Sequence, residues 1–339
     1  HTPMSKLQEI PLPADASDDL DRDAGSGEVQ ISPCRRAFLR GLPVQESESV
    51  QLSPGPGDYR SKRICGRDAI VLTYRYSGRL AIYTVPKSDR AVLVTSTNPA
   101  SDFVFNGRPC RPFDLCLSTG PDGYFSTGID RCNIAVGIRK SRLIAACATL
   151  AGIGAEDIRL SDLVIPRERV FGGTLHRALI GLSAAPGGPP LSEGEFTMVE
   201  ALEHDFIAVL AAQLVPFLRQ RAEVVPFKTD ALHVVRRATA LAGEQPTAGL
   251  VDLCMVTGVS QRWLHRCFID VIGVSPYRYV RFARLSKAHE ILLAADKRPK
   301  LVKSLALSLG YRLSGRFAAE YRSVFGENPS ETLTKSCKD

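Results

Sequence analysis

Hydrophobic and polar residues alternate with a short period in the first half of the chain and with a longer period in the second half. Between residues 69 and 138, short segments rich in β-branched and aromatic residues are separated by Gly, Pro and Asn, which is typical of antiparallel strands. We predict strands over 69–76, 80–85, 91–95, 102–105, 113–117 and 133–138. Asn106-Gly107 and Asp122-Gly123 are predicted hairpin turns, because each dipeptide tolerates a positive φ. Many short strands with such turns indicate an antiparallel sandwich or barrel.

From Ser141 onward, apolar residues recur at helical spacing, first over 142–150. A longer helix is predicted to begin at Ser192, which can form a capping box with Glu195, and to run to about Gln220. One stripe of this helix is predicted to pack on the barrel or on a second subunit: Met198, Ala201, Leu202, Asp205, Ala208 and Val209. An all-β unit followed by helices is typical of a sensor or binding barrel with a helical appendage.

The length of 339 residues predicts two domains, since single cores stop growing near about 250–300 residues. Residues 1–30 lack apolar periodicity and are expected to form a disordered acidic tail. We assign 31–222 to a ligand-sensing domain, 223–229 to a linker and 230–335 to a helical domain.

The net charge of +7 is concentrated in the last third of the chain. Residues 228–339 hold 18 Lys and Arg against 10 Asp and Glu, a net charge of +8, which leaves −1 for the remainder. Such an excess indicates either a nucleic-acid partner or an ordinary solvated surface, and charge alone does not choose between them.

Nine cysteines are scattered without a CxxC pair, which argues against a disulfide framework and a zinc ribbon. The longest apolar stretch, over 206–218, is shorter than the about 20 residues needed to cross a bilayer. No secretory signal is visible near the N-terminus. We therefore expect reduced thiols, no membrane partner and a cytoplasmic location.

Two pairs of short helices, each joined at a glycine, are predicted in the last third of the chain. In the first pair a helix from Val251 ends at Gly258, and Ser260 caps a second helix that runs through Ile272. In the second pair Gly310 is the turn. A connecting helix over 276–294 would span about 30 Å, close to the about 34 Å between successive major-groove faces on one side of DNA.

The spacings through both helix pairs and the connecting helix resemble those of the AraC/XylS family of bacterial transcription regulators. The resemblance covers about the last hundred residues and rests on Ser260, Arg262, Leu264, Arg266, Phe268, Gly273, Pro276, Tyr279, Arg284, Leu285, Ala288, 291–293, Gly310, Tyr311, Phe317, Tyr321, Arg322, Phe325, Gly326 and Pro329. More weakly, 92–147 resembles the cupin-like sensor domain of some members. The resemblance implies a multidomain fold, with an N-terminal all-β cupin-like barrel that carries a helical appendage and a C-terminal all-α double helix-turn-helix domain. It also implies double-stranded promoter or operator DNA, RNA polymerase and a small-molecule effector as partners, and a homodimer formed through 31–222.

The outer sides of the second helix in each pair carry the candidate DNA contacts, since arginine matches the acceptors of a guanine edge or a phosphate. These contacts are Ser260, Gln261, Arg262, Trp263, His265, Arg266, Arg312, Ser314, Arg316 and Arg322. In the second pair, Gly315 and the alanines after it reach no base, and Glu320 would repel phosphate if it faced DNA. We therefore expect Arg262, His265 and Arg266 to discriminate bases while the second pair anchors phosphates.

The effector pocket is less clearly indicated by the sequence. Tyr74 and Tyr76 share one face of a strand, as do Phe103 and Phe105, and these four residues either line a pocket or form ordinary core. Arg75 and Arg79 are either an anion site or a hairpin surface.

No cofactor, metal site or catalytic residue is predicted. Cupin enzymes hold metal with histidines on strands, whereas His176 and His204 fall in segments predicted to be helical. The sequence predicts a sequence-specific DNA-binding transcription regulator, an effector-responsive activator that reads two successive major-groove faces. The alternatives are a sequence-nonspecific architectural DNA binder and a cupin-type enzyme that carries a DNA-binding domain.

Overall fold

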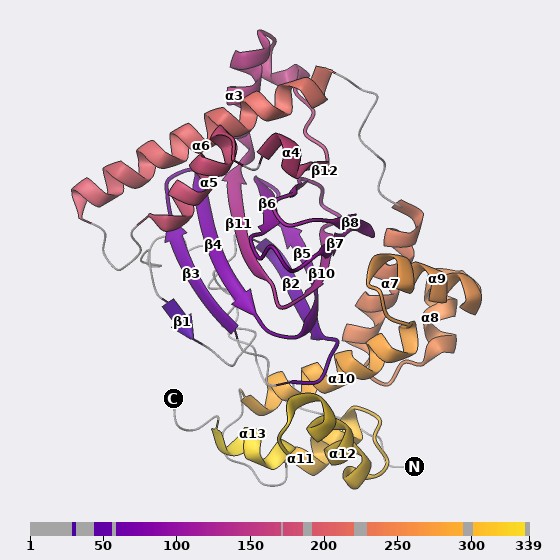
Figure 1. Cartoon of the computed structure of the whole chain (residues 1–339). Coiled ribbons are helices and arrows are strands. Elements are labelled where there is room, and N and C mark those ends of the chain that lie inside the picture. Colours follow the sequence, from indigo (N-terminus) through magenta and orange to yellow (C-terminus); the bar gives the residue numbers. More distant parts are fainter. Residues whose placement is uncertain are drawn as a thin grey trace, which may run out of the picture.

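The computed structural model describes residues 29–31, 44–55, 59–170, 172–185, 192–219, 229–293 and 301–335. Two β-sheets lie face to face, a layer of helices covers one sheet, and the C-terminal helices lie against the other (Figure 1). The predicted tail over 1–28 and the predicted linker up to residue 228 lie outside the described residues. Val29 and Gln30, at the end of the predicted tail, belong to a strand.

The described strand pairs are all antiparallel. The seven-stranded sheet has the order β1-β3-β4-β11-β6-β9-β12, and the five-stranded sheet has the order β2-β5-β10-β7-β8. The strands are β1 (Val29–Ile31), β2 (Val44–Gln51), β3 (Tyr59–Cys65), β4 (Ala69–Tyr76), β5 (Arg79–Pro86), β6 (Arg90–Ser96), β7 (Phe103–Phe105), β8 (Arg108–Cys110), β9 (Leu115–Ser118), β10 (Tyr124–Ile129), β11 (Cys132–Arg139) and β12 (Leu163–Ile165).

Each predicted strand has a counterpart, namely β4, β5, β6, β7, β9 and β11. The prediction over 113–117 was wrong at its start, because Phe113 has a φ of +70° and the strand begins at Leu115. The predicted turn at Asn106-Gly107 is confirmed, since both residues have positive φ and together they join β7 to β8.

After β11, the described part of the chain forms helices, with β12 between η1 and α4. These helices are α3 (Lys140–Ala151), η1 (Ala155–Asp157), α4 (Arg167–Val170), α5 (Thr174–Ala184) and α6 (Glu193–Arg219). Apolar side chains of α3, α5 and α6 pack on the outer face of the seven-stranded sheet. The capping box of α6 is confirmed, because the Ser192 N–H donates to Glu195 (2.9 Å) and the Glu195 N–H donates to the Ser192 hydroxyl (3.3 Å).

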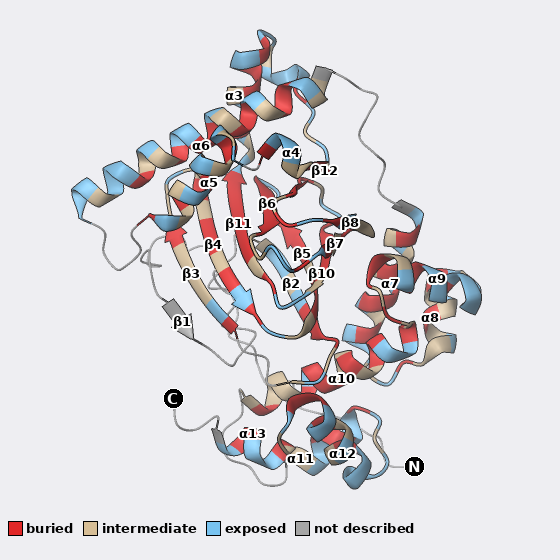
Figure 2. Ribbon diagram, in the orientation of Figure 1, coloured by how far each residue is buried: buried red, intermediate tan, exposed pale blue. Residues whose placement is uncertain are grey.

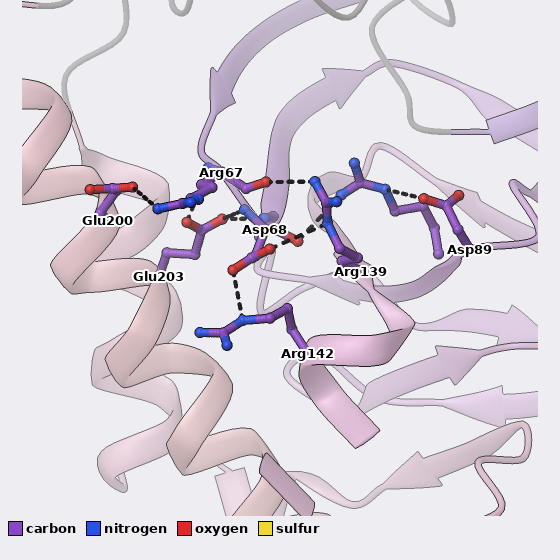
Figure 3. A network of polar contacts seen from close by, with 9 residues as sticks. Arg67, Asp68, Asp89, Arg139, Arg142, Glu200 and Glu203 are labelled. Carbon is purple, nitrogen blue, oxygen red and sulfur yellow. Dashed lines mark hydrogen bonds and ion pairs between the residues drawn. The ribbon is translucent and has the colours of Figure 1, made fainter. Parts of the chain in front are cut away.

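Helix α6 is fixed to the sheet by a buried carboxylate at the turn between β3 and β4 (Figure 3). Glu203 accepts hydrogen bonds from the backbone N–H groups of residues 67–69. Asp68 is paired in turn with Arg139 (3.3 Å) and Arg142 (2.8 Å). Burial raises the pKa of Glu203, and the three backbone donors oppose that rise without cancelling it.

Residues 193–218 of α6 are long and apolar enough to cross a membrane by length and composition, although the sequence suggested a shorter apolar stretch. A core helix of a soluble protein meets the same criteria. In this structure Phe206, Leu210 and Leu214 are fully buried against the sheet layer.

The two sheets enclose an inner cluster, defined as the buried apolar residues Tyr59, Leu72, Tyr74, Tyr76, Leu80, Ile82, Val92, Val94, Phe103, Phe105, Cys110, Cys116, Tyr124, Ala135 and Val164. Successive residues of a strand point to opposite faces, and the cluster members of β4 and β5 are accordingly two residues apart: Leu72, Tyr74 and Tyr76 on β4, and Leu80 and Ile82 on β5. Strand β10 contributes Tyr124. The intervening residues of β4 face the helical layer, and those of β5 and β10 face the C-terminal helices.

The C-terminal helices are α7 (Thr229–Glu244), α8 (Leu250–Thr257), α9 (Gln261–Val271), α10 (Pro276–Leu293), α11 (Leu301–Ser308), α12 (Ser314–Phe325) and α13 (Pro329–Lys335). Their shared core extends onto the five-stranded sheet, because Val50, Leu52, Ala81 and Phe125 belong to the same cluster of buried residues. Polar contacts join the same surfaces. The Gln51 N–H donates to the Ser286 hydroxyl (3.2 Å), and Asp122 is paired with Arg236. The C-terminal helices are therefore docked on the outer face of this sheet.

Candidate nucleic-acid interface

The first helix pair places a cap and a turn where the sequence predicts them. Helix α8 ends at Gly258, whose φ of +71° favours glycine. The Ser260 hydroxyl then accepts a hydrogen bond from the Trp263 N–H (3.3 Å) and caps α9. Leu264 and Phe268 are completely buried and fix the rotation of α9 about its axis. The cap and the core residues together set which side of α9 faces solvent.

The predicted contacts of the first pair all lie on the exposed side of α9 or at its start (Figure 2). They are Ser260, Gln261, Arg262, Trp263, His265 and Arg266. The Arg266 guanidinium lies 6.0 Å from the centre of the Trp263 ring, at the outer limit for a cation–π contact. Arg262, His265 and Arg266 thus share one solvent-facing surface of a single helix.

The second helix pair has the same order of parts, with α11, Gly310 at a φ of +83°, and α12. Phe317 and Tyr321, two of the residues that carry the family resemblance, are buried and form the inner side of α12. The predicted contacts of this pair are exposed: Arg312, Ser314, Arg316 and Arg322. Ser314 is the first residue of α12 and does not cap it, because the cap position is Leu313.

Glu320 changes the charge of the second pair. Its carboxylate is paired with Arg281 (2.9 Å) and Arg316 (3.1 Å) and accepts a hydrogen bond from the Tyr311 hydroxyl (3.0 Å). Burial alone would raise the pKa of Glu320, but these donors outweigh burial and hold the pKa below its ordinary value. The carboxylate therefore stays ionised and offsets part of the positive charge of Arg316.

Helix α10 connects the two pairs and begins at Pro276 as predicted. Its 18 residues span about 27 Å. A groove of about 860 Å³ lies between the two pairs, and its lining includes Arg281, Arg284, Arg312 and Arg316. The surface between the two pairs is therefore rich in arginine.

The four aromatic residues proposed for the effector, Tyr74, Tyr76, Phe103 and Phe105, all belong to the inner cluster. Burial raises the pKa of Tyr74 and of Tyr76, so both phenols keep their protons at neutral pH. The structure brings the two pairs of aromatics together in one buried cluster between the sheets.

Arg131 was not singled out from the sequence, although it lies among these aromatics. It is completely buried between the sheets, and its guanidinium carbon lies 4.2 Å from the centre of the Phe103 ring. Arginine in a two-residue link between strands is usually exposed, so its burial was not predictable from composition. The residues just before it, Ser126-Thr127-Gly128, are small and could have suggested room for a long side chain.

Arg75 and Arg79 do not form the single anion site considered from the sequence. Arg75 lines a hollow of about 400 Å³ together with Arg60 and Lys62. Arg79 lies instead against Gly273 of the C-terminal helices. Among the residues that the structure describes, no group of three or more His, Cys, Asp or Glu is placed to hold a metal ion.

Comparison with known proteins identifies the C-terminal helices. The family model of a helix-turn-helix domain matches residues 253–335. The chain is 41% identical over 76 residues to the probable thc operon regulatory protein of Rhodococcus erythropolis, a match that covers 22% of this chain and 23% of the relative. It is 36% identical over 89 residues to the XylDLEGF operon transcriptional activator of Pseudomonas putida, covering 26% of each chain. These matches thus span about a quarter of the relatives' length.

A solved structure of a probable AraC family transcriptional regulator from Rhodopseudomonas palustris is 34% identical. That match covers 30% of this chain and 96% of the regulator, with a TM-score of 0.28. The relatives named here are regulators and not enzymes. By its helix-turn-helix domain, whose matched residues include α9 and α12, the chain belongs to the AraC/XylS family.

Proposed function

We propose that this protein is a sequence-specific transcription regulator that reads DNA with α9 and anchors itself on the backbone with α12. The observation that carries the proposal is the surface of α9, where Arg262, His265 and Arg266 are exposed together on a helix held by a buried core. A helix of this kind fits the major groove of DNA, and arginine discriminates guanine by two hydrogen bonds.

The second helix pair is proposed to position the protein and not to read sequence. Glu320 offsets the charge of Arg316, and Ala318 and Ala319 offer no polar group to a base. Arg312 and Arg322 remain available for phosphates. In this proposal two helix-turn-helix units meet successive major-groove faces, and α10 sets their separation.

The N-terminal domain over 31–222 is proposed to bind a small-molecule effector between its sheets, next to Tyr74, Tyr76, Phe103 and Phe105. The exposed stripe of α6, which includes Met198 and Ala201, is proposed as a homodimer contact. An activating role and a contact with RNA polymerase rest on the family resemblance.

The test compares Arg262→Ala with Arg312→Ala in the full chain. Each purified variant is used to select fragments from genomic DNA, and affinity is then measured on the selected site and on random DNA at several salt concentrations. Arg262→Ala should lose about 1–3 kcal/mol on the selected site and little on random DNA, because a base contact is removed. Arg312→Ala should lose affinity about equally on both and show a smaller salt dependence.

Two results would contradict the proposal. If the unmodified chain selects no shared motif and its binding disappears steeply with salt, the protein is an architectural binder. If Arg312→Ala alters the preferred sequence while Arg262→Ala does not, the roles of the two units are reversed.

A further inference from the structure

Arg131 is a buried cation with an incomplete set of partners. Its side chain is 0% exposed, and its Nη1 donates to the Ser126 hydroxyl at 2.6 Å. Among the residues that the structure describes, its Nε and Nη2 have no hydrogen-bond partner, and no Asp or Glu is paired with it. Arginine keeps its charge at any pH a protein tolerates. A buried charge without a counter-charge is strongly destabilising, so an anionic partner would stabilise this guanidinium.

The unpartnered atoms have a specific geometry. The N–H of Nε and one N–H of Nη2 lie parallel on the same edge of the planar guanidinium, while Nη1 points elsewhere and is already used by Ser126. Two parallel donors on one edge match the two oxygens of a carboxylate. The ring of Phe103 lies over the guanidinium and leaves this edge uncovered by its stacking. The Nε and Nη2 edge of Arg131 therefore matches the two oxygens of a planar carboxylate.

Other unpartnered polar groups belong to the same interior. Both amide atoms of Asn133 are buried without a hydrogen-bond partner among the described residues. The buried Tyr76 hydroxyl makes no hydrogen bond of ordinary length, but it lies close enough to Arg131 for the guanidinium to oppose the rise in its pKa. Asn133 lies two residues before Ala135 on β11 and so shares its inward face. The charge of Arg131 acts on the pKa values of Tyr74, Tyr76 and Tyr124, which places these phenols close to it. A carboxylate at Arg131 thus has neutral donors within the same cluster.

The backbone beside Arg131 leaves room for its side chain. A Cβ atom at Gly128 would lie 2.4 Å from Cδ of Arg131 and 3.2 Å from its Cγ. The φ of Gly128 is not in the left-handed region, so glycine is needed here for space and not for backbone conformation. Strand β10 therefore accommodates the Arg131 side chain inside the sandwich because residue 128 has no side chain of its own.

We propose that the interior of the sandwich binds a small monocarboxylate with an apolar body, whose two oxygens accept hydrogen bonds from Nε and Nη2 of Arg131. The apolar body follows from the rest of the inner cluster, which supplies Leu72, Leu80, Ile82 and Phe105 as walls. The inference rests on the proposed effector role of this domain and names the chemical class of the effector.

The experiment measures the midpoint of thermal unfolding of the full chain in straight-chain monocarboxylates from acetate to octanoate and in phenylacetate, at constant ionic strength. The corresponding neutral amides are the control ligands. Arg131→Met removes the donors, and Arg131→Lys keeps the charge without the parallel pair of donors. Arg75→Met is the matched control, because Arg75 is exposed in the basic hollow with Arg60 and Lys62.

At least one carboxylate should raise the midpoint saturably in the unmodified chain and in Arg75→Met, while its amide does not. Arg131→Met should weaken that carboxylate by about 100-fold, because a desolvated charge pair is lost. If Arg131→Met fails to fold, Arg131→Lys decides, with an expected loss of about 10-fold.

Three results overturn the proposal. These are a response that survives in both Arg131 variants, a response lost in Arg75→Met instead, and the absence of any response in the unmodified chain. None of these measurements involves DNA, so their failure is distinct from a failure of base reading by Arg262.

Discussion

Phe125 should hold the C-terminal helices against the sandwich. It lies on β10, is 1% exposed, and packs within the cluster formed by α7, α9 and α10. Its ring centre is 4.8 Å from that of Tyr83 on the neighbouring strand. A buried phenylalanine removes about 150–250 Å² from water, which corresponds to about 4–6 kcal/mol at about 25 cal/mol per Å². Since alanine keeps its own methyl group buried, we expect Phe125→Ala to cost about 3–5 kcal/mol.

The loss should fall on the contact between domains and not on one domain alone. Phe105→Ala is the matched control, because Phe105 is 0% exposed but belongs to the inner cluster between the sheets. Calorimetry should show the transition of Phe125→Ala splitting into two, with the C-terminal helices unfolding separately. Phe105→Ala should lower the transition of the sandwich by a similar free energy.

The reasoning would be refuted if both variants lowered a single shared transition equally. That result would mean that the sandwich and the C-terminal helices unfold as one unit, and that Phe125 has no special place in joining them.

Two further predictions test the interior and the attachment of α6. Gly128→Ala should displace the Arg131 side chain and weaken any carboxylate response about as much as Arg131→Lys. Gly181→Ala in α5 is the contrasting substitution, because its Cβ would meet Leu202 at 3.7 Å, and it should stabilise the chain by about 1 kcal/mol. Thermal unfolding with and without the carboxylate measures both effects. Because burial raises the pKa of Glu203 above 4.5, its contribution to stability should be fully present below the unfolded pKa and lost as pH rises through the folded pKa. The free energy of unfolding of the unmodified chain should therefore fall relative to that of Glu203→Gln as pH rises above about 4.5, and a pH-independent difference in urea unfolding would contradict this.

The sequence predicted the helix pairs well because their signals are local. Ser260 caps α9, Gly258 and Gly310 end the preceding helices, and the apolar stripes alternate at helical spacing. Each of these signals depends on a few neighbouring residues and on physics that operates within one turn. The exposure of Arg262 and Arg266 followed directly from the buried stripe opposite them.

Two of the strands that the sequence did not predict, β2 and β10, contain polar residues that serve tertiary contacts. In β2, Glu46 and Glu48 line a hollow of about 550 Å³ together with Lys287 and Glu290 of α10. Residues 45–49 are all polar, so the sequence of β2 shows no alternation of apolar and polar positions there. In β10, Ser126 accepts a hydrogen bond from Arg131 and Gly128 makes room for it. These residues weaken the strand pattern for reasons that depend on distant parts of the chain.

Strand β10 contributes to both surfaces on which regulation would depend. Ser126 and Gly128 face Arg131, whereas Phe125, between Tyr124 and Ser126, faces the C-terminal helices. A ligand shifts an equilibrium between two arrangements only by the difference in its affinity for them. A carboxylate bound at Arg131 would therefore change DNA affinity only if docking of the C-terminal helices alters the position of β10 beside Arg131. Phe125→Ala distinguishes these steps, because it should leave carboxylate binding intact while removing the effect of the carboxylate on DNA affinity, and an unchanged effect would place the coupling outside β10.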